Sequence, residues 1–275
     1  MESKKDNEIK ITKQERKAFK AQRRFEKEQA KLKKFSTVTE SQPSTNTILC
    51  VRFGTKYPVS YVETMRNMIR RNITVPYRLV CLTDDPRPIE GVELIVQKNA
   101  GYARGWWHKV HMFDSNLPLS GRILYMDLDV VICGNIDKLT EIHGSEFMGI
   151  RDFNRRFHAN WKYLNSSVMS WMHGSQEHIY KDFMKNPQLA MRMHGDQDWT
   201  WKCCKNRIKF WPEKWIQSYK WEIRNRNELQ VIRGVRQFTS VRDDITIPEG
   251  CSILVFHGDP NPAMVQDKLV VDNWQ

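Results

Sequence analysis

The sequence predicts an α/β fold in which a mostly parallel sheet carries helices on both faces. Strand-like apolar runs alternate with segments of helical periodicity from residue 47 onward, which is typical of that class. The run 123–133 is apolar apart from two aspartates, as expected of a strand buried on both faces. In such sheets, ligands bind beyond the carboxyl ends of the strands.

The first half of the chain follows this β/α order. Strands are expected at 47–53, 77–82, 92–96 and 123–133. Tyr61, Met65, Met68 and Ile69 recur at helical spacing and predict a helix between the first two strands. A further helix is expected over 106–113. In the second half, strands are expected at 147–150, 166–171 and 252–256, and a helix at 176–185.

The N-terminus is strongly basic. Residues 1–34 hold thirteen Lys/Arg and six Asp/Glu, which accounts for +7 of the formal net charge of +12. We expect residues 1–46 to form a helical arm and linker, and residues 47–275 to form the catalytic domain. A solvated helix is the favoured interpretation of residues 1–35, and peripheral contact with an anionic membrane or a partner is the alternative.

The six cysteines lack a CxxC pair, and the N-terminus has no apolar leader. No run approaches the ~20 apolar residues of a membrane-spanning helix. A reduced, cytoplasmic protein is therefore predicted.

Asp127 and Asp129 are the most informative residues of the sequence. Buried carboxylates are unfavourable unless they are paired. Side chains two apart on a strand point to the same side, so these two carboxylates are expected to converge. A divalent cation with oxygen ligands is the partner that best explains them.

Five further segments accompany this pair. They are Gly54-Thr-Lys-Tyr57, Trp107-His-Lys109, Asn165-Ser-Ser-Val168, Gly195-Asp-Gln-Asp-Trp199 and His257-Gly-Asp-Pro260. Together with Asp127-Leu-Asp129, and in this order, they resemble nucleotide-sugar glycosyltransferases of the GT-A fold. The resemblance is to the retaining family eight, which includes glycogenin and lipopolysaccharide galactosyltransferases.

The resemblance implies a role for each matching residue. Asp127, Asp129 and His257 would bind Mn2+ or Mg2+. Gln197 and Asp198 would be the catalytic residues near the anomeric carbon. The substrate-binding residues would be Tyr57, stacked on the nucleotide base, and Lys109, Asn165, Asp196 and Gly258. From spacing alone, Lys109 could equally be an ordinary exposed helix lysine, and His257 could cap a strand.

The implied activity is transfer of a sugar from a nucleoside-diphosphate donor, UDP first, to a carbohydrate or other glycoconjugate hydroxyl, with retention of configuration. The cation would act as a Lewis acid on the leaving diphosphate. Two alternatives remain: a metal-dependent nucleotidyltransferase, which also uses paired aspartates, and a basic protein that binds RNA or membranes through residues 1–40. No nucleic-acid partner is expected of the transferase.

Overall fold

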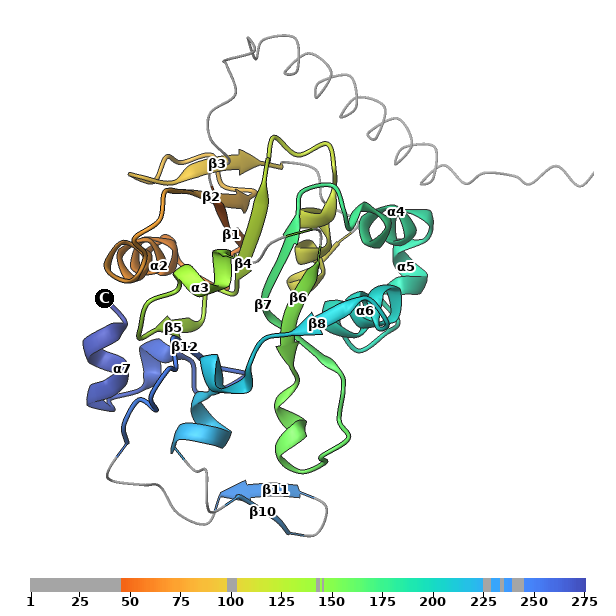
Figure 1. Cartoon of the computed structure of the whole chain (residues 1–275). Coiled ribbons are helices and arrows are strands. Elements are labelled where there is room, and N and C mark those ends of the chain that lie inside the picture. Colours follow the sequence, from red (N-terminus) through yellow and green to blue (C-terminus); the bar gives the residue numbers. More distant parts are fainter. Residues whose placement is uncertain are drawn as a thin grey trace, which may run out of the picture. The chain divides into compact units, whose positions relative to one another are not determined.

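The computed structural model describes residues 46–97, 103–141, 144, 146–224, 229–232, 235–238 and 245–275. Its centre is a seven-stranded sheet of order β3-β2-β1-β4-β7-β6-β8 (Figure 1). Residues 1–45 of the predicted arm and linker lie outside the described residues, so the domain boundary stays a prediction.

The central sheet is mostly parallel, which confirms the predicted fold class. β7 runs antiparallel to both of its neighbours, β4 and β6, and the other pairs in the sheet are parallel. Its strands are β1 (Asn46–Arg52), β2 (Tyr77–Thr83), β3 (Glu93–Val96), β4 (Arg122–Met126), β6 (Phe147–Arg151), β7 (Leu164–Met172) and β8 (Ile208–Phe210).

Helices cover both faces of the sheet (Figure 1). The α-helices are α2 (Val59–Asn72), α3 (Asp137–Thr140), α4 (Glu177–Lys185), α5 (Pro187–Ala190), α6 (Asp196–Cys204) and α7 (Lys268–Asn273). The 3-10 helices are η1 (Gly105–Phe113), η2 (Phe153–Arg156), η3 (Glu213–Trp215) and η5 (Pro262–Met264), and η4 (Tyr219–Arg224) is a π-helix. The segment predicted as a helix over 106–113 is therefore η1, a 3-10 helix.

Two hydrophobic cores flank the sheet because strand side chains alternate between its faces. On β1, Ile48 and Cys50 face the core that contains Met65 of α2. Leu49 faces the opposite core, which contains Val110 of η1 together with α4 and α6. All of these side chains are buried. This second core holds η1 and α6, which carry candidate site residues, against the same face of the sheet.

The predicted single strand over 123–133 is wrong, because the segment forms two strands in different sheets. β4 ends at Met126 in the central sheet. Asp127–Asp129 form a turn, and β5 (Val130–Ile132) belongs to a small sheet of order β5-β12-β9. Its other strands are β9 (Ile216–Ser218) and β12 (Ile253–Val255). A buried apolar run looks the same whether or not the chain changes sheets, so the sequence did not reveal the break.

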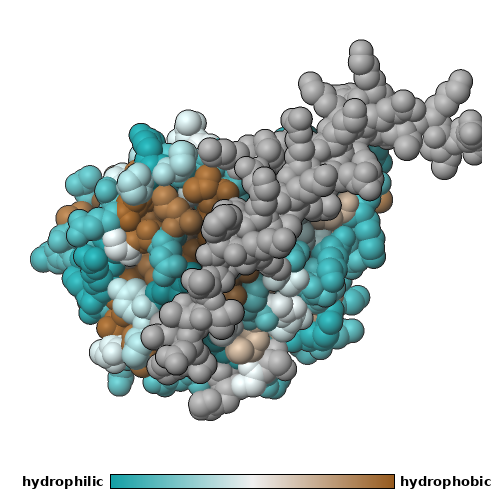
Figure 2. All heavy atoms as spheres, turned by 90° about the horizontal axis from the view of Figure 1, so that it is seen from above, coloured by the Kyte–Doolittle hydropathy of each residue, from teal (hydrophilic) through white to brown (hydrophobic). Residues whose placement is uncertain are grey.

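A separate hairpin of β10 (Leu229–Ile232) and β11 (Val235–Phe238) completes the described strands. Hydrophilic and hydrophobic areas alternate on the face of the molecule seen in Figure 2. In the described part of the chain, no helix is both long and apolar enough to cross a membrane.

Candidate functional site

The acidic turn Asp127–Asp129 joins the central sheet to the small sheet. The backbone N–H of Asp127 still pairs with the β7 carbonyl of Ser167, at 2.8 Å. Asp129 directly precedes β5. The carboxylates therefore come from a turn at the carboxyl end of β4, where an α/β sheet binds its ligands. They do not share one face of a continuous strand, as the sequence had suggested.

Lys109, from η1, connects this turn to α6. Its Nζ lies 2.9 Å from Oδ1 of Asp127 and 3.2 Å from Oδ2 of Asp196. It also donates to Oγ of Ser166 at 3.1 Å. The Lys109 side chain is only 12% exposed and that of Asp196 only 9%. The structure thus excludes the interpretation of Lys109 as an ordinary exposed helix lysine.

The first turn of α6 meets the start of β7 at this point. Ser166 Oγ donates to Oδ2 of Asp196 at 3.0 Å, and the Ser166 backbone N–H donates to Oε1 of Gln197 at 3.2 Å. Asn165, which precedes Ser166 in the chain, is buried, and its Oδ1 accepts a hydrogen bond from the backbone N–H of Ser167 at 3.1 Å. Two segments that the sequence singled out separately therefore form one hydrogen-bonded unit.

Burial and charge pull in opposite directions at this unit. Burial lowers the pKa of Lys109, but the charges of Asp127 and Asp196 outweigh it, so that pKa is raised and the ammonium stays charged. Burial raises the pKa of Asp196 more than Lys109 lowers it. The unit therefore has two acidic groups around one cation, in surroundings where an unpaired charge is costly.

Asp129 forms the second part of the site with Tyr57. The Tyr57 hydroxyl donates to Oδ2 of Asp129 at 2.8 Å. Burial, and next the neighbouring charge of Asp127, raise the pKa of Asp129 to about 6. Tyr125 holds the other carboxylate, with its hydroxyl 2.5 Å from Oδ1 of Asp127. Each aspartate thus receives a hydrogen bond from a tyrosine.

His257 lies at the same edge of the small sheet as Asp129. It follows β12, which pairs antiparallel with β5, and the register places Val255 opposite Val130. The Nε2 atom of His257 is 2.6 Å from Oγ of Ser218. Its ring lies between Phe153 and Trp221, with centroids 5.5 and 4.4 Å away.

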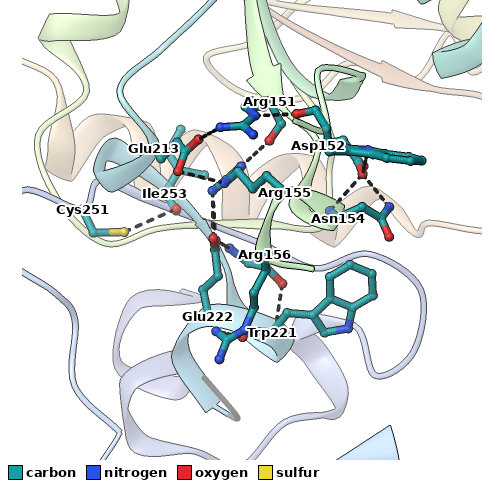
Figure 3. Close-up of polar contacts among 12 residues, drawn as sticks. Arg151, Asp152, Asn154, Arg155, Arg156, Glu213, Trp221, Glu222, Cys251 and Ile253 are labelled. Atoms are coloured by element: carbon teal, nitrogen blue, oxygen red, sulfur yellow. Dashed lines mark hydrogen bonds and ion pairs between the residues drawn. The ribbon is translucent and has the colours of Figure 1, made fainter. Parts of the chain in front are cut away.

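An arginine network centred on Arg155 connects η2 with Glu213 and Glu222 (Figure 3). Arg155 of η2, with 3% of its side chain exposed, donates to both oxygens of Glu222 at 3.0 and 3.1 Å. Glu222 in turn accepts the Ser218 backbone N–H at 2.8 Å. Arg155 and Arg151 both pair with Glu213. Through Ser218, this network fixes the position of the His257 ring.

The candidate metal ligands fit a cation only in part. Two carboxylates one residue apart on a turn are suitable oxygen donors for Mn2+ or Mg2+. Across the described residues, however, no three His, Cys, Asp or Glu side chains gather closely enough to hold a metal ion.

Two other predicted site residues, Asp198 and Gly258, are described by contacts and backbone geometry that do not involve Lys109. Asp198 is in the first turn of α6, and its side chain lies 3.8 Å from exposed His194. Gly258 follows His257 with a φ of 72°, a conformation that favours glycine.

Sequence reasoning missed Ser166, Tyr125 and Ser218. Single hydroxyls recur throughout the chain. Only Ser166 had a usable signal, because it lies inside Asn165-Ser-Ser-Val168.

The architecture is similar to that of solved glycosyltransferases. GlyE of Streptococcus pneumoniae TIGR4 is 16% identical with a TM-score of 0.58, over 84% of this chain and 60% of GlyE. The galactosyltransferase LgtC, in complex with donor and acceptor sugar analogs, is 11% identical with a TM-score of 0.54, over 82% of this chain and 96% of LgtC. The bifunctional WbbM is 13% identical with a TM-score of 0.58, over 86% of this chain and 51% of WbbM.

The shared architecture confirms the predicted GT-A, Rossmann-like fold. The aligned part spans less than two thirds of GlyE and about half of WbbM. No protein-family model and no curated protein matches the sequence.

Proposed function

We propose that this chain is a glycosyltransferase that moves a sugar from a nucleoside-diphosphate donor to a hydroxyl of a carbohydrate or glycoconjugate acceptor. UDP is the nucleotide that we favour. One observation carries the proposal: buried Lys109 is ion-paired with both Asp127 and Asp196, beside Gln197. These side chains meet at the carboxyl end of β4, in a fold shared with glycosyltransferases. GlyE, LgtC and WbbM support the reaction class through their own described activities.

Asp127 and Asp129 are the proposed ligands of a divalent cation, Mn2+ or Mg2+. His257 is the third ligand that the resemblance implies, and its ring would have to move closer to the two carboxylates, because these three side chains do not form a metal-binding group in the described part of the chain. When bound, such a cation acts as a Lewis acid toward the diphosphate leaving group. The raised pKa of Asp129 and its closeness to a second carboxylate support this assignment, because like charges in a partly buried site favour a cation between them.

The chain's own groups supply the remaining chemistry. Lys109 holds a fixed positive charge beside the donor and stabilises negative charge that develops on the leaving group. Asp196 and Asn165 are the proposed hydrogen-bond partners of the sugar hydroxyls. Gln197 is the proposed side chain next to the reacting carbon, and a solved active-site mutant of LgtC in which Gln is replaced by Glu supports an amide in such a role. Asp198 is proposed as a second catalytic group and Gly258 as a donor contact. Retention of configuration follows from the resemblance to family eight.

The direct test is release of UDP from a panel of UDP-sugars, with and without MnCl2. Wild type should release UDP in a manganese-dependent manner, and Asp129→Asn should abolish the release. Asp182→Asn is a matched control, because Asp182 is an exposed α4 carboxylate paired with Lys185. Turnover of no nucleotide sugar, or full activity in Asp129→Asn, contradicts the proposal.

The same preparation separates the alternatives. A nucleotidyltransferase would release pyrophosphate from a nucleoside triphosphate, which the transferase should not do. A basic binding protein would lose RNA or vesicle binding on deletion of residues 1–40 and keep it in Asp129→Asn. For the transferase we expect the reverse pattern in activity.

A further inference from the structure

The three strands of the small sheet bring different charged groups to one edge. β9 is parallel to β12, with Ser218 opposite Val255, and β5 is antiparallel to β12, with Val130 opposite Val255. The residues after β9 and β12, and the residue before β5, therefore lie at the same end. These are Lys220, His257 and Asp129. A cation, an imidazole and a carboxylate thus meet where the acidic turn begins.

Lys220 is held against the turn that follows β12. Its Nζ donates to the backbone carbonyl of Asp259. The same atom lies 3.8 Å from the point that a Cβ on Gly258 would occupy. Because Gly258 has no side chain, the ammonium remains close to the backbone of this turn.

The backbone around Lys220 is anchored on both sides. The preceding residue, Tyr219, is fully buried, stacks on Phe256 at 4.3 Å and donates its hydroxyl to Asp267. Two residues further on, Glu222 is clamped by Arg155. Lys220 therefore extends from a segment of η4 that is held by its neighbours, which limits the positions open to its side chain.

Lys220 lies near enough to the acidic turn to interact electrostatically with Asp129. Burial lowers the pKa of Lys220 below its usual value, and the charges of Asp259 and Asp129 oppose that shift. Among the residues that the structure describes, its close polar partner is a carbonyl, which carries no full charge. A partly buried ammonium opposite two carboxylates suits an anion between them, with a cation on the carboxylate side.

We infer that Lys220 binds the diphosphate of the donor, on the side of the site opposite Asp127 and Asp129. This inference rests on the proposed function and adds a residue from η4 to it. Lys109 and Lys220 then lie on different elements and neutralise different parts of the donor. Lys109 already forms ion pairs with Asp127 and Asp196, whereas the polar contact of Lys220 within the described residues is a backbone carbonyl.

The experiment is calorimetric titration of the full chain with UDP and with UMP, in the presence of MnCl2. Lys220→Met should weaken UDP binding by about 10- to 100-fold, the range for a charge-assisted contact. UMP, which lacks the second phosphate, should lose less than UDP, and Lys220→Arg should restore most of the affinity. Lys214→Met removes the same charge from an exposed position of η3 and should bind like wild type.

The outcomes separate the two proposals. If wild type binds no UDP, both the proposed function and this inference fail. If wild type binds UDP and Lys220→Met binds it equally well, only the role of Lys220 is overturned. Equal losses for UDP and UMP also overturn it, because a general structural defect would affect both ligands alike. Measurable UMP binding by Lys220→Met shows that the variant site is folded.

Discussion

Tyr57 donates its hydroxyl hydrogen to Asp129 at 2.8 Å, so a residue expected to stack on a nucleotide base also orients a carboxylate. The ring of Tyr57 packs against Tyr61, with centroids 5.0 Å apart, which leaves the hydroxyl directed at the acidic turn. The proposed base stacking depends on the ring of Tyr57, whereas the contact with Asp129 depends on its hydroxyl.

Tyr57→Phe separates them. The phenylalanine keeps the ring and removes one hydrogen bond to a charged acceptor, worth about 1.5–3 kcal/mol. We expect the Mn2+ concentration for half-maximal activity to rise about tenfold or more, with a smaller change in the KM for the donor. Activity titrated with MnCl2 measures this. An unchanged manganese requirement would show that the hydrogen bond does not orient Asp129.

Lys109→Met should destabilise the fold as well as abolish activity. It leaves Asp127 and Asp196 without their shared cation, and removal of one partner from a buried pair costs about 3–5 kcal/mol. Urea unfolding measures the loss, and Lys109→Arg should recover part of it. Lys185→Met breaks the exposed pair with Asp182 and should change the free energy of unfolding by under ~0.5 kcal/mol. Equal effects of the two methionine variants would argue against a buried ion-pair unit.

The arginine network of Figure 3 should behave as one unit. Arg155→Met leaves the partly buried Glu222 without its bidentate guanidinium partner, and we expect a loss of about 3 kcal/mol. Glu222→Gln should cost a similar amount, and the double variant should lose clearly less than the sum of both. The free energies of unfolding of wild type, both single variants and the double variant give the coupling energy between Arg155 and Glu222. Strict additivity would mean that the two side chains do not stabilise each other.

The contribution of His111 to stability should fall as the pH is lowered from about 6.5 toward 4, whereas Asp129, with its pKa raised to about 6, contributes in the opposite direction. Burial, and next the charge of His108, lower the pKa of His111 to about 4. The unfolded chain therefore binds a proton that the folded chain excludes across this window. The contribution of neutral His111 is complete above pH 6.5 and is lost as the pH falls, by about 3 kcal/mol at most.

Thermal unfolding at several pH values checks the sign. Between pH 6.5 and 4, His111→Phe should lose up to about 3 kcal/mol less stability than wild type, whereas substitution of exposed His194 should leave the pH dependence unchanged. A pH dependence of His111→Phe identical to that of wild type would contradict this role of His111.

Much of the fold could be predicted because local signals agree with it. The spacing of Met65, Met68 and Ile69 predicts α2, and those side chains are fully buried against β1. The break between β4 and β5 could not be predicted, since Val130 and Ile132 are as buried as Leu124. Their apolar character fits either sheet, and tertiary pairing alone decides between them.

The site divides in the same way. Paired carboxylates and Asp196-Gln197 stand out because buried acidic groups are unusual in such contexts. Lys109 contacts these carboxylates because η1 and α6 pack in one core, and the sequence alone does not reveal that packing. Lys220 gave no signal, because its position follows from the register of β9 and β12, which only the folded chain reveals.

The acidic turn spans a joint. Asp127 is hydrogen-bonded into the central sheet, whereas Asp129 leads into the small one, and one leucine separates them. A cation bound by both carboxylates would therefore link two sheets that are otherwise joined here by a single turn. Binding of the cation with the donor should slow amide hydrogen exchange along β5 and β12, including at residues that do not contact the ligand.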